Sequence, residues 1–146
     1  MVLMIDMATA EAAGERFHGS AVARFAFGLL VIAAPDSQDD HAGWDAATEA
    51  VHAGNDSLYV GVRDAASGPV GVTCVEEPFA VDGLGLLHRG EIELSRRSLA
   101  IYEPNAQLRL ELPVERVLNR VSVYGDDGDE PARILVVLGD PSEPLR

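Results

Sequence analysis

Apolar and polar residues alternate along most of the chain, the pattern of β-strands that bury one face and expose the other. The clearest example is 107–112, where Leu108, Leu110 and Leu112 alternate with polar residues. The stretch 20–33 also alternates, and Gly28 within it predicts either one long bent strand or two short ones. Further strands are predicted at 58–63, 70–75, 91–95, 98–102, 120–124 and 133–139, with a short apolar segment at 79–83 and a glycine-flanked edge element at 83–90.

This pattern predicts a mainly β fold, an antiparallel β-sandwich of about eight or nine short strands. At 146 residues the chain is expected to form one domain over 16–140, with a mobile N-terminal tail at 1–15 and a C-terminal tail at 141–146. Residues 70–75 are apolar on both faces, so this strand is expected at the centre of a sheet covered on both sides. Cys74 within it is expected to be a buried small hydrophobe.

One stretch departs from the strand pattern. Between residues 35 and 54, Trp44, Ala47 and Val51 recur at helical spacing, which predicts one short helix packed at an end or edge of the sandwich. Acidic residues precede its first turn, where negative charge complements the helix dipole, and Gly54 is expected to cap its end. Trp44, the single tryptophan, is expected either to clamp the helix to the sheet or to face a partner.

The formal net charge is −13, and the chain contains no lysine. Residues 1–83 carry thirteen acids against three arginines, while residues 84–146 carry eleven acids against eight arginines. A field of this sign repels nucleic acids and membrane surfaces, and it favours a basic partner or a divalent cation. A single cysteine and the absence of a signal-peptide pattern make the cytoplasm the expected location.

Recognisable catalytic motifs are absent from the sequence, so we expect neither an enzyme nor a cofactor. The four histidines are scattered, and a two-histidine metal site would need them to meet in the fold. Glu76 and Glu77 are interpreted as solvated charges at a strand end. The acidic loop Asp126, Asp127, Asp129 and Glu130 is a low-ranked candidate for Ca²⁺, because hard cations prefer several carboxylates around a turn.

The order of features resembles the competence protein J family, small inhibitors of the competence-associated DNA-entry nuclease. The resemblance covers roughly residues 20–138. It rests on Gly43-Trp44-Asp45, on LYVGV at 58–62, on VGVTCVEEPFAVDGLGL at 70–86, on LRLELP at 108–113 and on VSVY at 121–124. The sequence departs from the family where a glycine turn is expected after Leu112-Pro113, because VERVLNR follows instead.

The resemblance implies a non-catalytic protein that binds and inhibits a nuclease, or an immunity protein directed against another toxin. A nuclease presents a basic cleft for phosphates, which carboxylates on an inhibitor can occupy. No arginine lies between Arg24 and Arg63, so the strongest acidic patch is expected there. The partner-binding residues are therefore predicted to be Asp36, Asp39, Asp40, Trp44, Asp45 and Glu49.

Two alternatives remain open from the sequence. The first is a Ca²⁺-binding or carbohydrate-binding β-sandwich module that uses the 126–130 loop. The second is a structural subunit of an assembly, or a homodimer, that exposes the edge at Leu84–Leu87.

Overall fold

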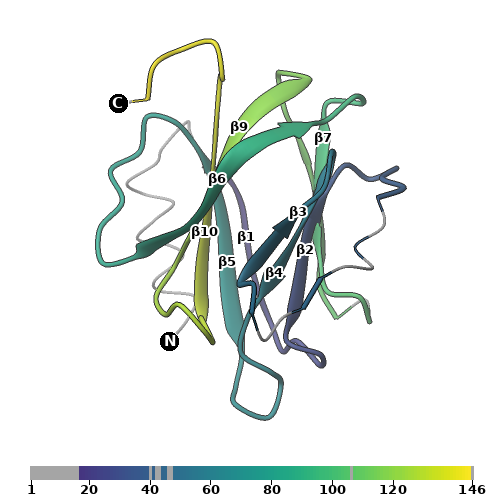
Figure 1. Cartoon of the computed structure of the whole chain (residues 1–146), viewed down its shortest axis with the longest axis vertical. Coiled ribbons are helices and arrows are strands. Elements are labelled where there is room, and N and C mark those ends of the chain that lie inside the picture. Colours follow the sequence, from purple (N-terminus) through teal and green to yellow (C-terminus); the bar gives the residue numbers. More distant parts are fainter. Residues whose placement is uncertain (1–16, 40, 42–43, 46–47, 106, 146) are drawn as a thin grey trace.

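Ten strands build the described part of the chain (Figure 1). The computed structural model describes residues 17–39, 41, 44–45, 48–105 and 107–145. No helix long and apolar enough to cross a membrane occurs among them. The strands are β1 (Phe17–Ala23), β2 (Leu29–Ala33), β3 (Val51–Ala53), β4 (Ser57–Gly61), β5 (Val70–Glu76), β6 (Gly85–Glu93), β7 (Ser98–Tyr102), β8 (Arg109–Pro113), β9 (Leu118–Gly125) and β10 (Arg133–Gly139).

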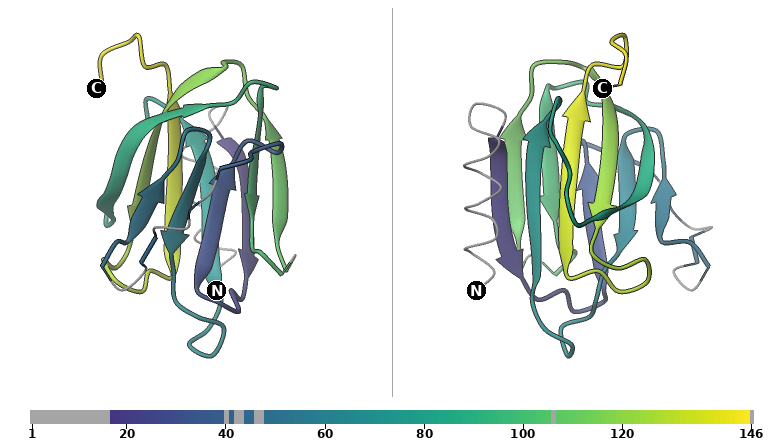
Figure 2. Two further views of the ribbon diagram at one scale, coloured as in Figure 1. Left: turned by 45° about the vertical axis from the view of Figure 1, so that its right-hand side comes forward. Right: turned by 90° about the vertical axis from the view of Figure 1, so that its left-hand side faces the viewer.

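The strands form two five-stranded sheets that face each other as the layers of a sandwich (Figure 2). Sheet A has the order β1-β5-β10-β9-β6, and sheet B has the order β3-β4-β2-β7-β8. The chain passes from sheet A to sheet B between β1 and β2, so the prediction of two short strands within 20–33 is the correct one. The elements expected at 83–90 and 91–95 are one strand, β6, which forms an edge of sheet A.

One pair of strands is parallel. β10 runs alongside β5 in the same direction, with Ile134 opposite Val72, whereas the other strand pairs are antiparallel. The predicted antiparallel sandwich is therefore right except at this pair. β5 lies between β1 and β10, as expected for an apolar strand inside a sheet.

The main core lies between the two sheets. Alternate residues of each strand point into it, so that Leu30 and Ile32 of β2 and Val72 and Cys74 of β5 are all 0% exposed. Fully burying a side chain of the Val, Leu or Ile type stabilises the fold by about 1.5–3 kcal/mol. The alternation of apolar and polar residues in the sequence therefore determines which face of each strand points into the core.

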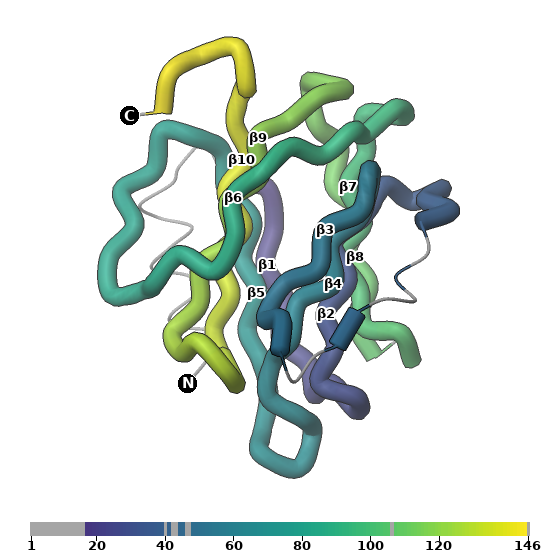
Figure 3. Tube along the Cα trace, viewed as in Figure 1, coloured from purple at the N-terminus to yellow at the C-terminus, as the bar shows by residue number. Residues whose placement is uncertain are grey.

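A second, smaller cluster covers the outer face of sheet A and explains why β5 and β10 are apolar on both faces. Val75, Leu135 and Val137 are buried there. The connection from β5 to β6, which projects beyond the sheet (Figure 3), packs Phe79 and other apolar side chains against them. The short apolar segment at 79–83 is thus part of a covering loop.

The predicted helix between residues 35 and 54 is wrong for the residues that the structure describes. Val51–Ala53 form β3, in which Val51 pairs with Val60 of β4. Gly54 follows this strand and donates its amide to the Ser57 carbonyl in the turn to β4, instead of capping a helix. Short isolated helices are marginal in water, and the free edge of β4 offers backbone hydrogen bonds that a helix over the same residues would forgo.

Candidate partner-binding site

We call the segment 35–50, which lies in the sequence between β2 and β3, the acidic loop; its described residues His41 and Trp44 contact the outer face of sheet B. Tyr59 alternates with the buried Leu58 and Val60 and therefore points to this outer face. The His41 imidazole stacks on the Tyr59 ring, with ring centroids 3.8 Å apart and planes 13° apart. Trp44 meets the same ring edge-on at 5.5 Å. The described parts of the loop are therefore held against the sheet by aromatic contacts.

The six predicted partner-binding residues have different surroundings. Asp45 and Glu49 are exposed, and exposed Asp36 forms an ion pair with Arg96 at 3.2 Å. Half-buried Trp44 donates its indole N–H to the Glu49 carbonyl at 3.1 Å, so its ring clamps the loop to the sheet. Asp39 is half-buried and turned toward the strands, and Asp40 lies outside the described residues.

Four polar side chains, two from the acidic loop and one each from β3 and β4, form a continuous series of hydrogen bonds, which we call the His–Ser–Asp chain. His52 Nδ1 and His41 Nδ1 are 2.8 Å apart, and His41 Nε2 lies 2.6 Å from Ser57 Oγ. The Ser57 hydroxyl then donates to Asp39 Oδ2 at 2.9 Å. The fold thus brings together two histidines that the sequence had suggested were scattered. No local motif signals this, because the pairs are 11 and 16 positions apart.

The direction of the hydrogen bonds follows from the chemistry of the groups. An ionised carboxylate only accepts, so the one hydroxyl hydrogen of Ser57 goes to Asp39. His41 Nε2 must then be the donor to Ser57 Oγ. A serine nucleophile needs the opposite arrangement, in which the imidazole accepts the hydroxyl hydrogen. Ser57 is also only 3% exposed, so the pair is not arranged for nucleophilic attack.

Asp39 is the anchor of the chain. Burial by itself raises the pKa of Asp39, but hydrogen bonds from the Asp56 amide and the Ser57 hydroxyl, with the charge of His41, hold that pKa below its ordinary value. Burial and the neighbouring carboxylates raise the pKa of Asp56. Gly54 makes the approach possible, because a Cβ on it would lie 2.3 Å from Asp39 Oδ2.

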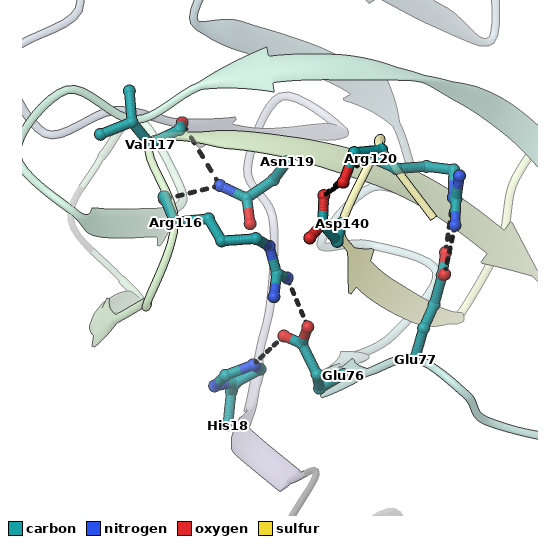
Figure 4. Close-up of polar contacts among 9 residues, drawn as sticks. His18, Glu76, Glu77, Arg116, Val117, Asn119, Arg120 and Asp140 are labelled. Atoms are coloured by element: carbon teal, nitrogen blue, oxygen red, sulfur yellow. Dashed lines mark hydrogen bonds and ion pairs between the residues drawn. The ribbon is translucent and has the colours of Figure 1, made fainter. Parts of the chain in front are cut away.

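A second polar group, the arginine cluster, lies at one end of the sandwich (Figure 4). It consists of His18, Glu76, Glu77, Arg116 and Arg120. The Glu76 carboxylate accepts from Arg116 and from His18, the latter at 3.0 Å. Glu77 accepts two bonds from Arg120, at 2.9 and 2.7 Å. The interpretation of Glu76 and Glu77 as solvated charges is therefore wrong, because arginines distant in sequence neutralise both.

A cavity of about 290 Å³ opens beside this cluster, between the β5–β6 connection and residues 140–145. Arg89 on its wall donates to the Ser122 hydroxyl at 3.0 Å and to the Tyr124 hydroxyl at 2.8 Å. Because Glu76 and Glu77 already have cationic partners, the cavity offers fewer free carboxylates than its lining suggests. Its polar groups hold the end of the sandwich together.

The 126–130 loop lies between β9 and β10, and two of its four acids, Asp126 and Asp127, accept hydrogen bonds from the loop's own backbone or from residues just after it. Asp127 Oδ2 accepts the amides of Asp129 and Glu130 at 3.1 and 2.8 Å. Asp126 Oδ1 accepts the Ala132 amide at 2.8 Å. Across the described residues, no group of three or more His, Cys, Asp or Glu side chains is placed to hold a metal ion. Neither finding supports the calcium alternative.

The fold and the site together define a two-layer β-sandwich that presents exposed acids on a loop pinned to its outer face. No protein-family model matches the chain, and no curated protein sequence matches it. Among solved structures, the chain is similar to ComJ from Bacillus subtilis, described as an inhibitor of the DNA-degrading activity of NucA. The TM-score is 0.68 at 8% identity, over 86% of this chain and 97% of ComJ. This likeness shows a shared fold.

Proposed function

We propose that this chain is a non-catalytic protein that binds and inhibits a nuclease. The observation that carries the proposal is the fold, which matches an inhibitor of a DNA-degrading enzyme over nearly that protein's whole length. The net charge of −13 fits a basic partner, because a nuclease attracts phosphates to a positive cleft.

We assign the contact surface to the acidic loop. Asp36, Asp40, Asp45 and Glu49 would provide the carboxylates that face the basic partner. Asp39 and Trp44 would act indirectly, because Asp39 binds the β3–β4 turn and the Trp44 indole binds the Glu49 carbonyl. Electrostatic attraction across such a surface raises the association rate and makes it sensitive to salt.

The proposed lack of catalysis is supported by the order of donors in the His–Ser–Asp chain. The Ser57 hydroxyl gives its hydrogen to Asp39, so His41 is not free to act as a general base toward it. Location in the cytoplasm and self-association through the β6 edge, where Leu86 is 48% exposed, stay predictions that cell fractionation and solution mass can check.

The test compares two triple variants with equal changes in charge. The first, Asp36→Asn/Asp45→Asn/Glu49→Gln, removes the exposed acids of the loop. The control, Asp82→Asn/Asp129→Asn/Glu130→Gln, removes three exposed acids elsewhere. We expect the association rate with the nuclease to fall about tenfold or more in the first variant and much less in the control. Equal rates in the two variants would show that the loop is not the contact surface.

A further inference from the structure

The cavity beside the arginine cluster lies against the outer face of sheet A. One row of side chains crosses three neighbouring strands there, because Val137 of β10 pairs with Ser122 of β9, and Ser122 pairs with Arg89 of β6. The residues on either side of Ser122 in β9 are buried in the main core, so Ser122 and Tyr124 point to the outer face. All four residues line the cavity.

Two neutral groups hold the Arg89 guanidinium in place. Its Nε donates to the Ser122 hydroxyl at 3.0 Å, and its Nη2 donates to the Tyr124 hydroxyl at 2.8 Å. Among the described residues, no carboxylate forms an ion pair with Arg89, whereas Arg116 and Arg120 each have one. Two of the five N–H groups of a guanidinium are thus used, and the edge between Nη1 and Nη2 keeps hydrogens to donate.

The wall of the cavity has more hydrogen-bond donors than acceptors. A hydroxyl that accepts from Arg89 still carries its own hydrogen, and the described residues offer no acceptor for the hydroxyl hydrogen of Ser122 or of Tyr124. The Nε–H of Arg116, which also lines the cavity, is buried and has no hydrogen-bond partner among them. This surplus of donors suits a ligand that brings negatively charged oxygens.

We propose that the cavity is a binding site for a small organic acid, a monocarboxylate with an apolar body. The carboxylate lies on the Nη1–Nη2 edge of Arg89, because the planar guanidinium matches the two carboxylate oxygens. The apolar body lies among Phe79, Val137 and Leu145, which line the same cavity. Its volume of about 290 Å³ is near the lower end of the roughly 300–1,000 Å³ found for ligand pockets, so the site takes a small molecule.

The charges around the cavity restrict the charge of the ligand. Arginines already neutralise Glu76 and Glu77 (Figure 4), so neither carboxylate competes for Arg89. Asp140 and Glu143 also line the cavity, and the whole chain carries a net charge of −13. These negative charges oppose a ligand with two or more negative charges, such as a phosphate dianion, more strongly than a monocarboxylate.

The test is a titration of the purified full chain with benzoate and with hexanoate, followed through the NMR signals of the backbone amides. We expect saturable changes at Ser122, Tyr124 and Val137, with a dissociation constant of about 1 mM or tighter. Benzamide and hexanamide keep the apolar body but lack the charge, so they should bind about tenfold or more weakly. Acetate keeps the charge but lacks the apolar body and should also bind more weakly.

Two variants with equal changes in charge locate the site. Arg89→Gln should lower the affinity for benzoate about tenfold or more. Arg109→Gln, which removes a half-exposed arginine of β8 in the other sheet, should leave that affinity unchanged. Glu143→Gln removes a like charge from the cavity wall, so it should not weaken binding. Urea unfolding of each variant shows whether it is folded.

Three results would overturn the proposal. The first is the absence of saturable changes with either acid up to about 10 mM. The second is equal affinity for an acid and its amide in the wild-type protein, a comparison that needs no variant to fold. The third is an equal loss of affinity in Arg89→Gln and Arg109→Gln, or no loss in Arg89→Gln. No nuclease is present in these measurements, so their outcome is independent of the proposed function.

Discussion

The ion pair between Glu77 and Arg120 allows a quantitative prediction. Arg120 donates two hydrogen bonds to the carboxylate, at 2.9 and 2.7 Å, and the Arg120 and Glu77 side chains are only 13% and 16% exposed. Hydrogen bonds to charged groups contribute roughly 1.5–3 kcal/mol, and bidentate pairs of arginine with a carboxylate are among the strong ones. A double-mutant cycle with Glu77→Gln and Arg120→Met should therefore give a coupling free energy of about 1.5–3 kcal/mol.

The assay is reversible urea unfolding of wild type, the two single variants and the double variant at one salt concentration. The control cycle uses Arg109 and Glu111, which are 2.6 Å apart but have 47% and 53% exposed side chains. Water screens such a pair, so its coupling should lie at about 0–1 kcal/mol. A coupling for Glu77 and Arg120 no larger than that of the exposed pair would refute the claim that the arginine cluster stabilises this end of the sandwich.

Three further predictions follow from the burial and charge of single residues. Burial alone raises the pKa of Glu76, but hydrogen bonds from His18 and Arg116, together with the charge of Arg116, hold that pKa below its ordinary value. The contribution of Glu76 to stability is therefore present at neutral pH and is lost as pH falls through the folded-state pKa. Glu76→Gln should flatten the fall of the unfolding free energy below roughly pH 5, and an unchanged fall of stability in acid would contradict this. Burial raises the pKa of the Cys74 thiol far above its ordinary value, so thiol reagents should label Cys74 only after denaturant has unfolded the protein. Labelling of Cys74 in the native protein would contradict its 0% exposure. Ile101→Ala should destabilise the fold by about 2–5 kcal/mol, because Ile101 is fully buried. In the same unfolding assay, Phe27→Ala should change stability by less than about 0.5 kcal/mol, because Phe27 is 72% exposed. Similar losses of stability in the two variants would contradict the assignment of the core.

The strands and their buried faces could be predicted because apolar and polar residues alternate along the sequence of each strand. Leu108 and Leu112 are buried in the main core, and β5 is apolar on both faces because one face meets the core and the other meets the outer cluster. The parallel pairing of β5 with β10 could not be predicted, since it joins segments about sixty residues apart and leaves no local signal. For the same reason, the sequence could not show that the chain passes from sheet A to sheet B at 24–28.

The helix was predicted because a run of small residues with Trp44 imitates helical spacing. The segment instead ends in β3, where backbone hydrogen bonds to β4 replace those of a helix. In the candidate site, too, some features could be predicted from the sequence and others could not. The acids could be found by counting charges, whereas the meeting of His41 with His52, and of Glu77 with Arg120, depends on the fold alone.

The most direct test is a titration of the purified protein into a DNA-cleavage reaction by a NucA-type nuclease from the same source as this chain, with ComJ and NucA as a parallel reaction. The account predicts saturable inhibition that is complete near equimolar amounts and weakens as salt is added. Cleavage that continues at full rate under a large excess of the folded protein, while ComJ inhibits NucA, would contradict the account.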